Sequence, residues 1–241
     1  MTVKPLEHLQ FERLNPLEID QVLQQNSLVY IPLGAFEWHG LHLPVGLDSL
    51  TSHGICLRAA DKTGGLVMPP FYYGMSGSIW HHPHTILIED EEIFLKILKT
   101  TLTRLETIGI KKVVIFTGHF SLKQLEALIT LKKDWLSIQN SLELSIFSIS
   151  DCPTVKIEAD HGAIFETSVL AEIDPNLVKL ENLPPIDTYP ANDPDGNSKG
   201  DHRRDPNNIL FGIFGDDPRH YDKLTGKVIV NKIVDWLIQS I

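Results

Sequence analysis

The chain has 241 residues and an acidic balance, with 21 Lys and Arg against 31 Asp and Glu and a formal net charge of −10. This charge argues against nucleic-acid binding, which needs clustered basic residues, and two cysteines are too few for a disulfide framework or a Cys-rich zinc module. No apolar run approaches the roughly 20 residues of a membrane span, and the first residues lack the apolar core of a signal peptide. We therefore expect a single cytoplasmic domain over residues 1–241, without nucleic-acid or membrane partners.

The first half of the chain alternates between strand and helix patterns. Short apolar runs rich in β-formers indicate buried strands, and periodic apolar positions indicate amphipathic helices. In chain order we expect a strand over 27–34, a loop over 35–47, a helix from Asp48 as its N-cap to about Thr63, a strand over 66–69, a Gly- and aromatic-rich loop over 71–85, and a helix over 91–107 with an apolar face of Ile93, Phe94, Ile97, Leu98, Leu102 and Leu105.

The second half continues the alternation. In chain order we expect an apolar strand over 111–117, a turn at 118–120, a helix from Ser121 to about Trp135, a strand over 143–148, a helix over 165–173, a polar surface loop over 184–208, and a short strand-like run followed by a C-terminal helix within 221–241. This order predicts an α/β fold, a layered sandwich with a mostly parallel central sheet flanked by helices and joined by right-handed crossovers.

Residues able to bind a metal follow two of the predicted strands. Eight of the 11 histidines fall between positions 39 and 161, and histidine is the commonest metal ligand and acid–base group. Glu37 and His39 follow the first strand, His119 follows the central strand, and Asp48 heads the helix after the first loop. Because sites in open α/β sheets form outside the carboxyl ends of the strands, we expect these side chains to meet at one rim.

The spacing of Glu37 and His39 suggests how they could bind metal ions. In an extended segment, residues two apart point to the same side, so the carboxylate and the imidazole could serve two adjacent divalent ions, with Asp48 bridging them. Oxygen and imidazole ligands without thiolate suit Zn²⁺, Mn²⁺ or Fe²⁺, and a water held between two such ions becomes a nucleophile near neutral pH. Each residue alone also has a plainer role: a solvated loop residue for Glu37 or His39, a helix cap for Asp48 or His119.

Three segments resemble the motifs of the creatininase family of metal-dependent amidohydrolases. Residues 31–48 read IPLGAFEWHGLHLPVGLD, against a family pattern of L-P-x-G-x-x-E-x-H-G-x-H-L-P-x-x-x-D. Residues 117–119 resemble the second motif, N-G-H-x-x-N, and residues 160–168, DHGAIFETS, resemble the third, H-A-x-x-x-E-T-S. The motifs occur in family order and the resemblance extends from about Val29 to about Val178. It implies an α/β layered sandwich with a mostly parallel sheet.

The resemblance also implies a two-metal centre. Glu37, Asp48 and His119 would hold one ion, and His39 and Asp48 the other. The family Glu that completes the second ion is Ser121 here, a poor substitute, while Glu166 would lie near the site as a ligand or base. By the same resemblance His161 would act beside the substrate as general acid, with Glu166 as the alternative donor.

Other positions bear on the substrate. We expect Ser78, Trp80 and His82, in the loop over 72–85, to contact it. Departures from the family pattern fall around this region: Thr117 and Leu122 replace two Asn, His84 replaces a Gly, and no Trp lies between residues 151 and 161 to form the lid used by creatininase itself. These changes leave the metal ligands in place and argue against creatinine as the substrate.

We therefore expect a metal-dependent hydrolase of C–N bonds in a small cyclic amide or formamide, using two divalent ions (Zn, Mn or Fe). The family commonly forms closed homo-oligomers, often hexamers. Alternatives are a non-catalytic metal- and ligand-binding protein of the same fold, a ring-opening hydrolase of a carbohydrate-derived substrate, and a metal-free serine hydrolase that uses Ser121 or Ser168 with His161. The last lacks the Gly-x-Ser-x-Gly elbow.

Overall fold

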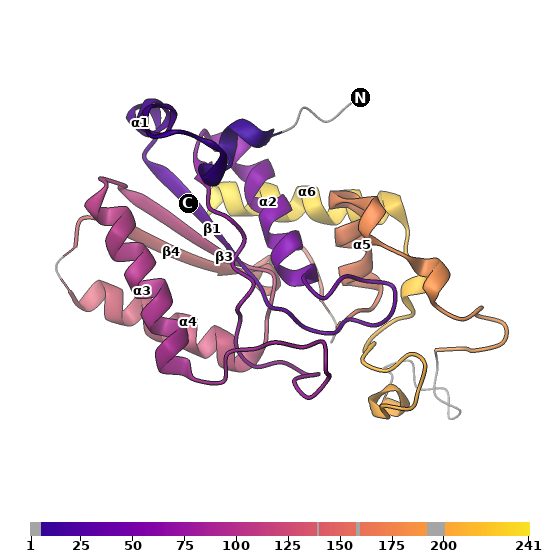
Figure 1. The fold of residues 1–241 in the computed structure, drawn as a ribbon. Helices are drawn as coiled ribbons and strands as arrows, with labels where there is room; N and C mark the ends of the chain where they lie inside the picture. The colour runs from indigo at the N-terminus through magenta and orange to yellow at the C-terminus, as the bar shows by residue number, and fades with distance from the viewer. Residues whose placement is uncertain (1–5, 139, 158–159, 192–200) are drawn as a thin grey trace.

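A parallel sheet forms the centre of the molecule. The computed structural model describes residues 6–138, 140–157, 160–191 and 201–241. Four strands pair in the order β2–β1–β3–β4, all parallel. They are β1 (Leu28–Leu33), β2 (Leu66–Val67), β3 (Lys112–Thr117) and β4 (Glu143–Ser148). Figure 1 shows β1, β3 and β4 lying side by side between layers of helix.

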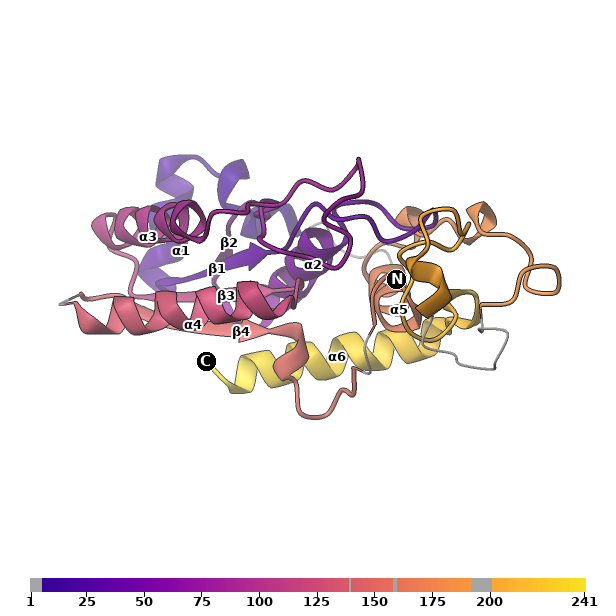
Figure 2. The same cartoon turned by 90° about the horizontal axis from the view of Figure 1, so that it is seen from below.

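Helices cover both faces of this sheet, as Figure 2 shows from a second direction. One layer contains α3 and α4, and the other contains α2 and α6, against which α5 packs. The helices are α1 (Pro16–Gln25), α2 (Leu47–Thr63), α3 (Glu91–Thr107), α4 (Leu122–Ser137), α5 (Ile164–Ile173) and α6 (Lys223–Gln239). The α/β sandwich with a parallel sheet confirms the predicted fold class. Among the described residues, no helix is both long and apolar enough to cross a membrane.

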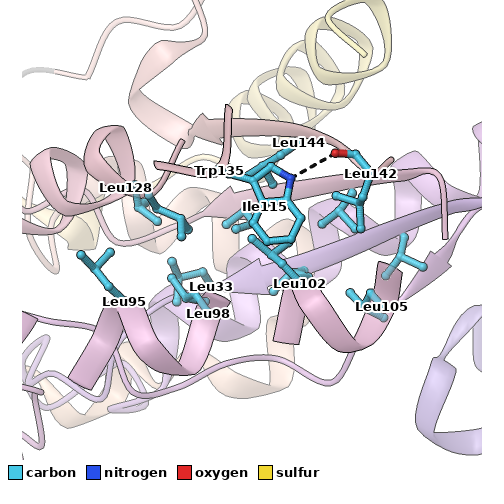
Figure 3. Packing of buried hydrophobic residues seen from close by; sticks show 14 of the residues in the cluster. Leu33, Leu95, Leu98, Leu102, Leu105, Ile115, Leu128, Trp135, Leu142 and Leu144 are labelled. Atoms are coloured by element: carbon cyan, nitrogen blue, oxygen red, sulfur yellow. Dashed lines mark hydrogen bonds between the residues drawn. The ribbon is translucent and has the colours of Figure 1, made fainter. Parts of the chain in front are cut away.

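Alternation along the strands supplies one apolar layer to each side. In β1, Val29 contacts the cluster that includes α3 and α4, whereas Tyr30 contacts the cluster of α2 and α6. Figure 3 shows the first cluster, in which Trp135 of α4 packs with Leu102 of α3 and donates its indole N–H to the Leu142 carbonyl at 3.1 Å. This bond satisfies the one polar group of a buried side chain.

Two local expectations about helices were wrong, and a third concerned the C-terminal segment. Helix α2 has Gly46 as its N-cap, so Asp48 lies inside the first turn. Its buried carboxylate faces His39 and His119 in the neighbouring loops and does not cap the helix. Ile93 and Ile97 are exposed because the buried stripe of α3 runs through Leu95 instead.

The C-terminal segment contains no strand in the structure. Helix α6 is continuous from Lys223, and the Asp222 carboxylate accepts the Thr225 N–H at 2.7 Å as its cap. The apolar run that resembled a strand forms part of the helical stripe through Val230 and Val234, which packs against the sheet. Part of the predicted loop over 184–208, residues 192–200, lies outside the described residues.

Candidate metal centre

The ends of the strands and the start of α2 converge on one buried cluster. The register places Leu33 opposite Thr117, and Thr117 opposite Ser148, so β1, β3 and β4 end at the same level. From there the loop after β1 carries Glu37 and His39, and the turn after β3 carries His119. These side chains and Asp48 are between 1% and 6% exposed.

Two glycines allow this convergence. A Cβ on Gly34, directly after β1, would lie 2.2 Å from the backbone nitrogen of Ser49, and one on Gly118 would lie 2.3 Å from the Asp48 carbonyl oxygen. Both distances are far below van der Waals contact. The first turn of α2 can therefore approach the strand ends only because these positions lack side chains.

The cluster contains three overlapping groups of three possible ligands, of which two share Asp48 and the third consists of Glu37, His39 and His161. On one side the His119 Nδ1 lies 2.9 Å from Asp48 Oδ2 and 3.6 Å from Glu37 Oε2. On the other side the His39 Nε2 lies 3.4 Å from Asp48 Oδ1 and 3.7 Å from Glu166 Oε2. In each group the three ligand atoms lie within 4.8 Å of one another. The two oxygens of Asp48 thus face different groups, as a bridging carboxylate requires.

Backbone carbonyls orient both imidazoles. The His39 Nδ1–H donates to the Glu37 carbonyl at 2.9 Å, and the His119 Nε2–H donates to the Ser76 carbonyl at 2.7 Å. In each ring the other nitrogen faces the carboxylates and would become an electron-pair donor once a cation displaces its proton. This is the arrangement in which metal-binding histidines are held by an outer shell of hydrogen bonds.

The donor set fits divalent cations. The His39 Nε2 and both carboxylate oxygens of Asp48 are buried without a hydrogen-bond partner among the described residues. Buried polar atoms without partners are costly, and a cation between them would satisfy all three. Carboxylate and imidazole ligands suit Zn²⁺, Mn²⁺ or Fe²⁺.

The pKa shifts point in the same direction. Burial alone would lower the pKa of both histidines, but the neighbouring carboxylates, with Asp48 the strongest, together outweigh it and raise the pKa of His39 to about 10 and that of His119 to about 9. Burial would raise the pKa of Asp48, but His39 and His119 bring it below its ordinary value. Protons on the two imidazoles therefore supply positive charge where cations would otherwise bind.

Helix α5 supplies Glu166, and the turn before it supplies His161. The Glu166 carboxylate accepts the Gly162 N–H at 2.5 Å, and burial raises its pKa well above the ordinary value. The His161 Nε2–H donates to the Trp38 carbonyl at 2.8 Å, and its ring stacks on His39 with 4.2 Å between centroids. Burial, followed by the charge on His39, lowers the pKa of His161 to about 4, so this ring is neutral with Nδ1 as a proton acceptor.

A cavity of about 430 Å³ opens onto this cluster. Its lining includes Glu37, His119, Asp160, His161 and Glu166.

The residues expected to contact substrate lie at different places around the cavity. Ser78 lines it. Trp80 is 65% exposed and lines a neighbouring hollow, which shares Ser76 and Gly77 with the cavity. His82 stacks on Trp38 at 4.0 Å and is not part of the cavity lining. The structure thus brings all four expected ligands together with His161, Glu166 and Ser78, and leaves Trp80 and His82 further out.

Comparison with known proteins agrees with this geometry. The family model described as "Creatininase: Creatinine amidohydrolase" matches residues 12–241, nearly the whole chain. The chain belongs to the creatininase family. It is thus a creatininase-family hydrolase with buried groups of residues that could bind metals.

The curated proteins that this chain resembles differ in activity. The chain is 27% identical to a creatinine amidohydrolase of Pseudomonas putida over 200 residues, 71% of this chain and 76% of that protein. It is 30% identical to a 3-dehydro-scyllo-inosose hydrolase of Thermotoga maritima over 112 residues, 45% of this chain and 35% of that protein. It is 29% identical to a mycofactocin precursor peptide peptidase of Mycobacterium ulcerans over 164 residues, 64% of this chain and 62% of that protein.

Solved creatininase structures share the fold. A crystal structure of creatinine amidohydrolase superposes with a TM-score of 0.72 over 96% of both chains at 22% identity. A structure described as "Creatininase Mn" matches equally well, with the same TM-score, coverage and identity. A mutant creatininase described as "Zn-Zn type" also matches with a TM-score of 0.72 over 96% of both chains, at 21% identity.

Sequence reasoning about this creatininase-family chain missed three charged residues of the cavity lining. Asp160 precedes α5, and its carboxylate accepts the backbone N–H of Phe165 at 2.9 Å and of Glu166 at 3.2 Å. Its place as the first residue of the segment that resembles the third motif was the available signal. Lys123 and Arg204 also line the cavity. No motif marks them, because their position depends on how α4 and the segment around 204 pack.

Ser121 has a structural role at this site. It is the N-cap of α4, where its Oγ accepts the Gln124 N–H at 3.4 Å and donates to the Met75 carbonyl at 3.0 Å. The third possible ligand atom of the group with His39 and Asp48 is an oxygen of Glu166, on a different helix.

Proposed function

We propose that this creatininase-family protein is a metal-dependent hydrolase of C–N bonds in a small cyclic amide or formamide, with two divalent ions (Zn, Mn or Fe). The observation that carries this proposal is the pair of three-residue groups that share the Asp48 carboxylate, with its oxygens and the His39 Nε2 buried and unpaired. Glu37, Asp48 and His119 would hold one ion. His39, Asp48 and Glu166 would hold the other.

The chemistry then divides between the ions and the chain. When bound, two divalent ions lower the pKa of a water and polarise a carbonyl oxygen. The chain contributes the remaining steps. Ser78 and the walls of the 430 Å³ cavity position the amide, and burial of the cluster excludes bulk water from the reacting groups.

His161 is the proton carrier in this proposal. Its Nε2–H is held by the Trp38 carbonyl, and its lowered pKa leaves Nδ1 free to accept the proton released as water adds to the carbonyl carbon. The same nitrogen then gives the proton to the leaving nitrogen as the C–N bond breaks. Glu166 would stand in as donor if it were not a ligand, but its place beside His39 and Asp48 favours the ligand role.

Metal analysis of the purified protein, together with a screen of small lactams and formamides, tests the proposal. We expect close to two ions per chain, activity that is lost on chelation and restored by added Zn²⁺ or Mn²⁺, and about one ion per chain in Glu166→Gln. Thr167→Ser, a conservative change one position along α5, should retain both ions. A metal-free protein that stays fully active would overturn the proposal.

A second candidate is a ring-opening hydrolase of a carbohydrate-derived substrate. The relative from Thermotoga maritima, a 3-dehydro-scyllo-inosose hydrolase, favours it. Turnover of inososes but not of amides would distinguish the two. Binding of metal and ligand without turnover of either class would identify the non-catalytic alternative.

The serine-hydrolase alternative is disfavoured by two hydrogen bonds. The Ser121 Oγ donates to the Met75 carbonyl, and the Ser168 Oγ donates to the Ile164 carbonyl at 2.6 Å. Both hydroxyls are thus bonded to backbone rather than to His161. Insensitivity of activity to chelators would revive this alternative.

The single-domain organisation over 1–241, the homo-oligomeric assembly with a hexamer as its common family form, and the cytoplasmic location stay predictions. Light scattering of the purified protein tests the assembly.

A further inference from the structure

A buried glutamine connects two of the segments that surround the metal centre. Gln124 lies in the first turn of α4 and is fully buried. Its side-chain oxygen accepts the Met75 N–H at 2.8 Å, and its side-chain nitrogen donates to the Thr117 Oγ1 at 2.9 Å and to the His119 carbonyl at 3.3 Å. These partners fix the orientation of the amide, because a backbone N–H can only donate and a carbonyl can only accept.

His119 is held at both ends by this arrangement. Its carbonyl accepts from Gln124 and, at 2.7 Å, from the Thr117 hydroxyl, which fixes the backbone of the residue. Its ring Nε2–H donates to the Ser76 carbonyl at 2.7 Å, and Ser76 directly follows Met75, the residue bonded to the Gln124 oxygen. A closed chain of contacts thus runs from the His119 backbone through Gln124 and the loop to the His119 ring.

The loop is strained at the residue that accepts from the His119 ring. Ser76 has a φ of +58° and is the one described residue other than glycine with a positive φ. This left-handed conformation is unfavourable for a residue with a Cβ and persists where neighbouring contacts fix it. The hydrogen bond from Met75 to Gln124, one residue earlier, is such a contact. Without it, we expect the loop to relax and the Ser76 carbonyl to leave the His119 ring.

The same loop also contacts Glu37. The Ile79 N–H donates to the Glu37 Oε1 at 2.9 Å. Glu37 and His119 form with Asp48 one of the two groups of possible ligands that share this aspartate. The other group takes a residue from α5, to which the described hydrogen bonds of Gln124 do not extend. The network therefore acts on the ligands of one proposed ion.

We propose that Gln124, together with Thr117, is a positioning residue that fixes His119 as a ligand of this ion. The inference rests on the proposed function, because it requires that the cluster binds divalent ions. It also gives a role to one departure from the family pattern, since Thr117 stands where the second motif has Asn and its hydroxyl belongs to the network.

Titration of the metal-free protein with Zn²⁺ against a competing chelator tests the proposal by resolving two binding steps. Gln124→Met keeps the length of the side chain and removes its three hydrogen bonds. We expect it to weaken one Zn²⁺ by about 10–100-fold, as for other outer-shell partners of ligating histidines, and to leave the second within about twofold of the parent. Thr117→Val should weaken the same ion by less, and Thr117→Ser, which keeps the hydroxyl, should match the parent.

A double variant identifies the weakened ion. Glu166→Gln should leave one ion per chain, held by Glu37, Asp48 and His119. Adding Gln124→Met to it should weaken that single ion by the same factor. A single ion that is unaffected would overturn the proposal.

Two controls separate positioning from general loss of stability. The Ser121 Oγ donates to the Met75 carbonyl at 3.0 Å, and no described hydrogen bond joins it to His119. Ser121→Ala therefore loosens the same loop without releasing the histidine and should leave both Zn²⁺ affinities unchanged. Leu102→Ala lowers stability away from the cluster and should also leave them unchanged. Affinities that fall in step with stability in these controls would show that Gln124 acts only by supporting the fold.

Solvent exchange of the His119 Nε2–H reports on the ring itself. Its proton NMR signal is identified by its loss in His119→Gln. In the metal-free protein we expect this proton to exchange at least about tenfold faster in Gln124→Met than in the parent, because loss of one hydrogen bond has about this effect. Selective weakening of Zn²⁺ without faster exchange would contradict the route through Ser76.

The outcomes separate this inference from the proposed function. One weakened ion with faster exchange supports the inference. Unchanged Zn²⁺ affinities in Gln124→Met overturn it and leave the hydrolase standing. A parent whose two ions respond as expected but which hydrolyses none of the amides keeps the inference and contradicts the hydrolase. A parent that binds no Zn²⁺ overturns both. If Gln124→Met does not fold, Thr117→Val decides by the same criteria.

Discussion

Two regions of the molecule are nearly closed to water: the apolar layer under α3 and α4, and the polar cluster at the strand ends. Only in the apolar layer does the buried polar group have a hydrogen-bond partner. In the apolar layer, Leu102 and Ile115 are buried among hydrophobic neighbours, and the single indole N–H of Trp135 has its acceptor. In the polar cluster, Asp48 is just as buried, yet both of its carboxylate oxygens are without a hydrogen-bond partner.

The difference shows which region depends on something outside the chain. Burial of apolar side chains is favourable by itself, at about 25 cal/mol per Å². Burial of carboxylates and imidazoles is costly unless each is paired. The cluster is therefore a place where the fold gives up stability for function, and the following changes should affect the two regions in opposite ways.

Asp48→Ala should give the largest functional effect. Because both groups share this carboxylate, we expect metal content to fall from about two ions per chain to near zero, and activity to fall by more than the roughly 10–100-fold that loss of an outer-shell partner costs. Elemental analysis and chelator-controlled assays measure this. The metal-free variant should still fold, by circular dichroism. Two ions retained in Asp48→Ala would contradict the bridging role.

Leu102→Ala should lower the stability of the fold and leave the metal content unchanged. Removal of a fully buried leucine leaves a cavity in the layer shown in Figure 3 and should lower the free energy of unfolding by about 2–5 kcal/mol. Denaturant titration measures the loss. Metal content at a temperature where the variant is folded should equal that of the parent, and a variant that lost its metal there would show that the two regions are coupled.

Gly77→Ala should weaken only one of the two groups. A Cβ at this position would lie 2.3 Å from the Glu37 Oε1, so the carboxylate must leave the position in which its Oε2 faces His119. We expect affinity for one ion to fall about 10–100-fold while the second ion stays bound. Competition titration with a chelator resolves the two steps. Gly109→Ala, where a Cβ meets nothing within 4 Å but φ is +93°, is the control that alters stability alone.

A rise in pH should lower the contribution of the two imidazoles to the stability of the metal-free fold and should raise the affinity for metal. The pKa values of His39 and His119 are raised from 6.5 to about 10 and about 9 in the metal-free fold, so their contribution to stability is complete below about pH 6.5 and is lost as the pH rises through 9 and 10. A metal must displace these protons. Apparent Mn²⁺ affinity should therefore rise between pH 6 and 8, by up to about tenfold per pH unit for each proton released. Affinity that is independent of pH would show that the imidazoles are not ligands.

Ser121→Ala should give the smallest change and should spare the metals. Loss of the N-cap of α4 should cost about 0.5–2 kcal/mol of stability. Thermal melts and metal analysis measure both quantities. A drop in metal content would mean that the serine, rather than Glu166, completes the second group.

Much of the fold and most of the cluster could be predicted because the signals are local. The strands β1, β3 and β4 are apolar runs of the right length, and Gly64 ends α2 with φ of +81° at the predicted place. The expected N-cap at Asp48 failed for an instructive reason. The residue types of a cap and of a first-turn ligand are the same, and only the packing of α2 against the strand ends decides which way the carboxylate faces.

The sequence by itself determined the parallel α/β sandwich and the convergence of Glu37, His39, Asp48 and His119, because strand order and the residues at strand ends follow from patterns within short segments. Only the tertiary structure decided that Glu166 on α5 lies beside His39 and Asp48, that His161 stacks on His39 with its Nε2–H bound to Trp38, and that Lys123 and Arg204 line the same cavity. These contacts join segments far apart along the chain. Their geometry depends on how helices pack around the sheet, which no spacing of residues records.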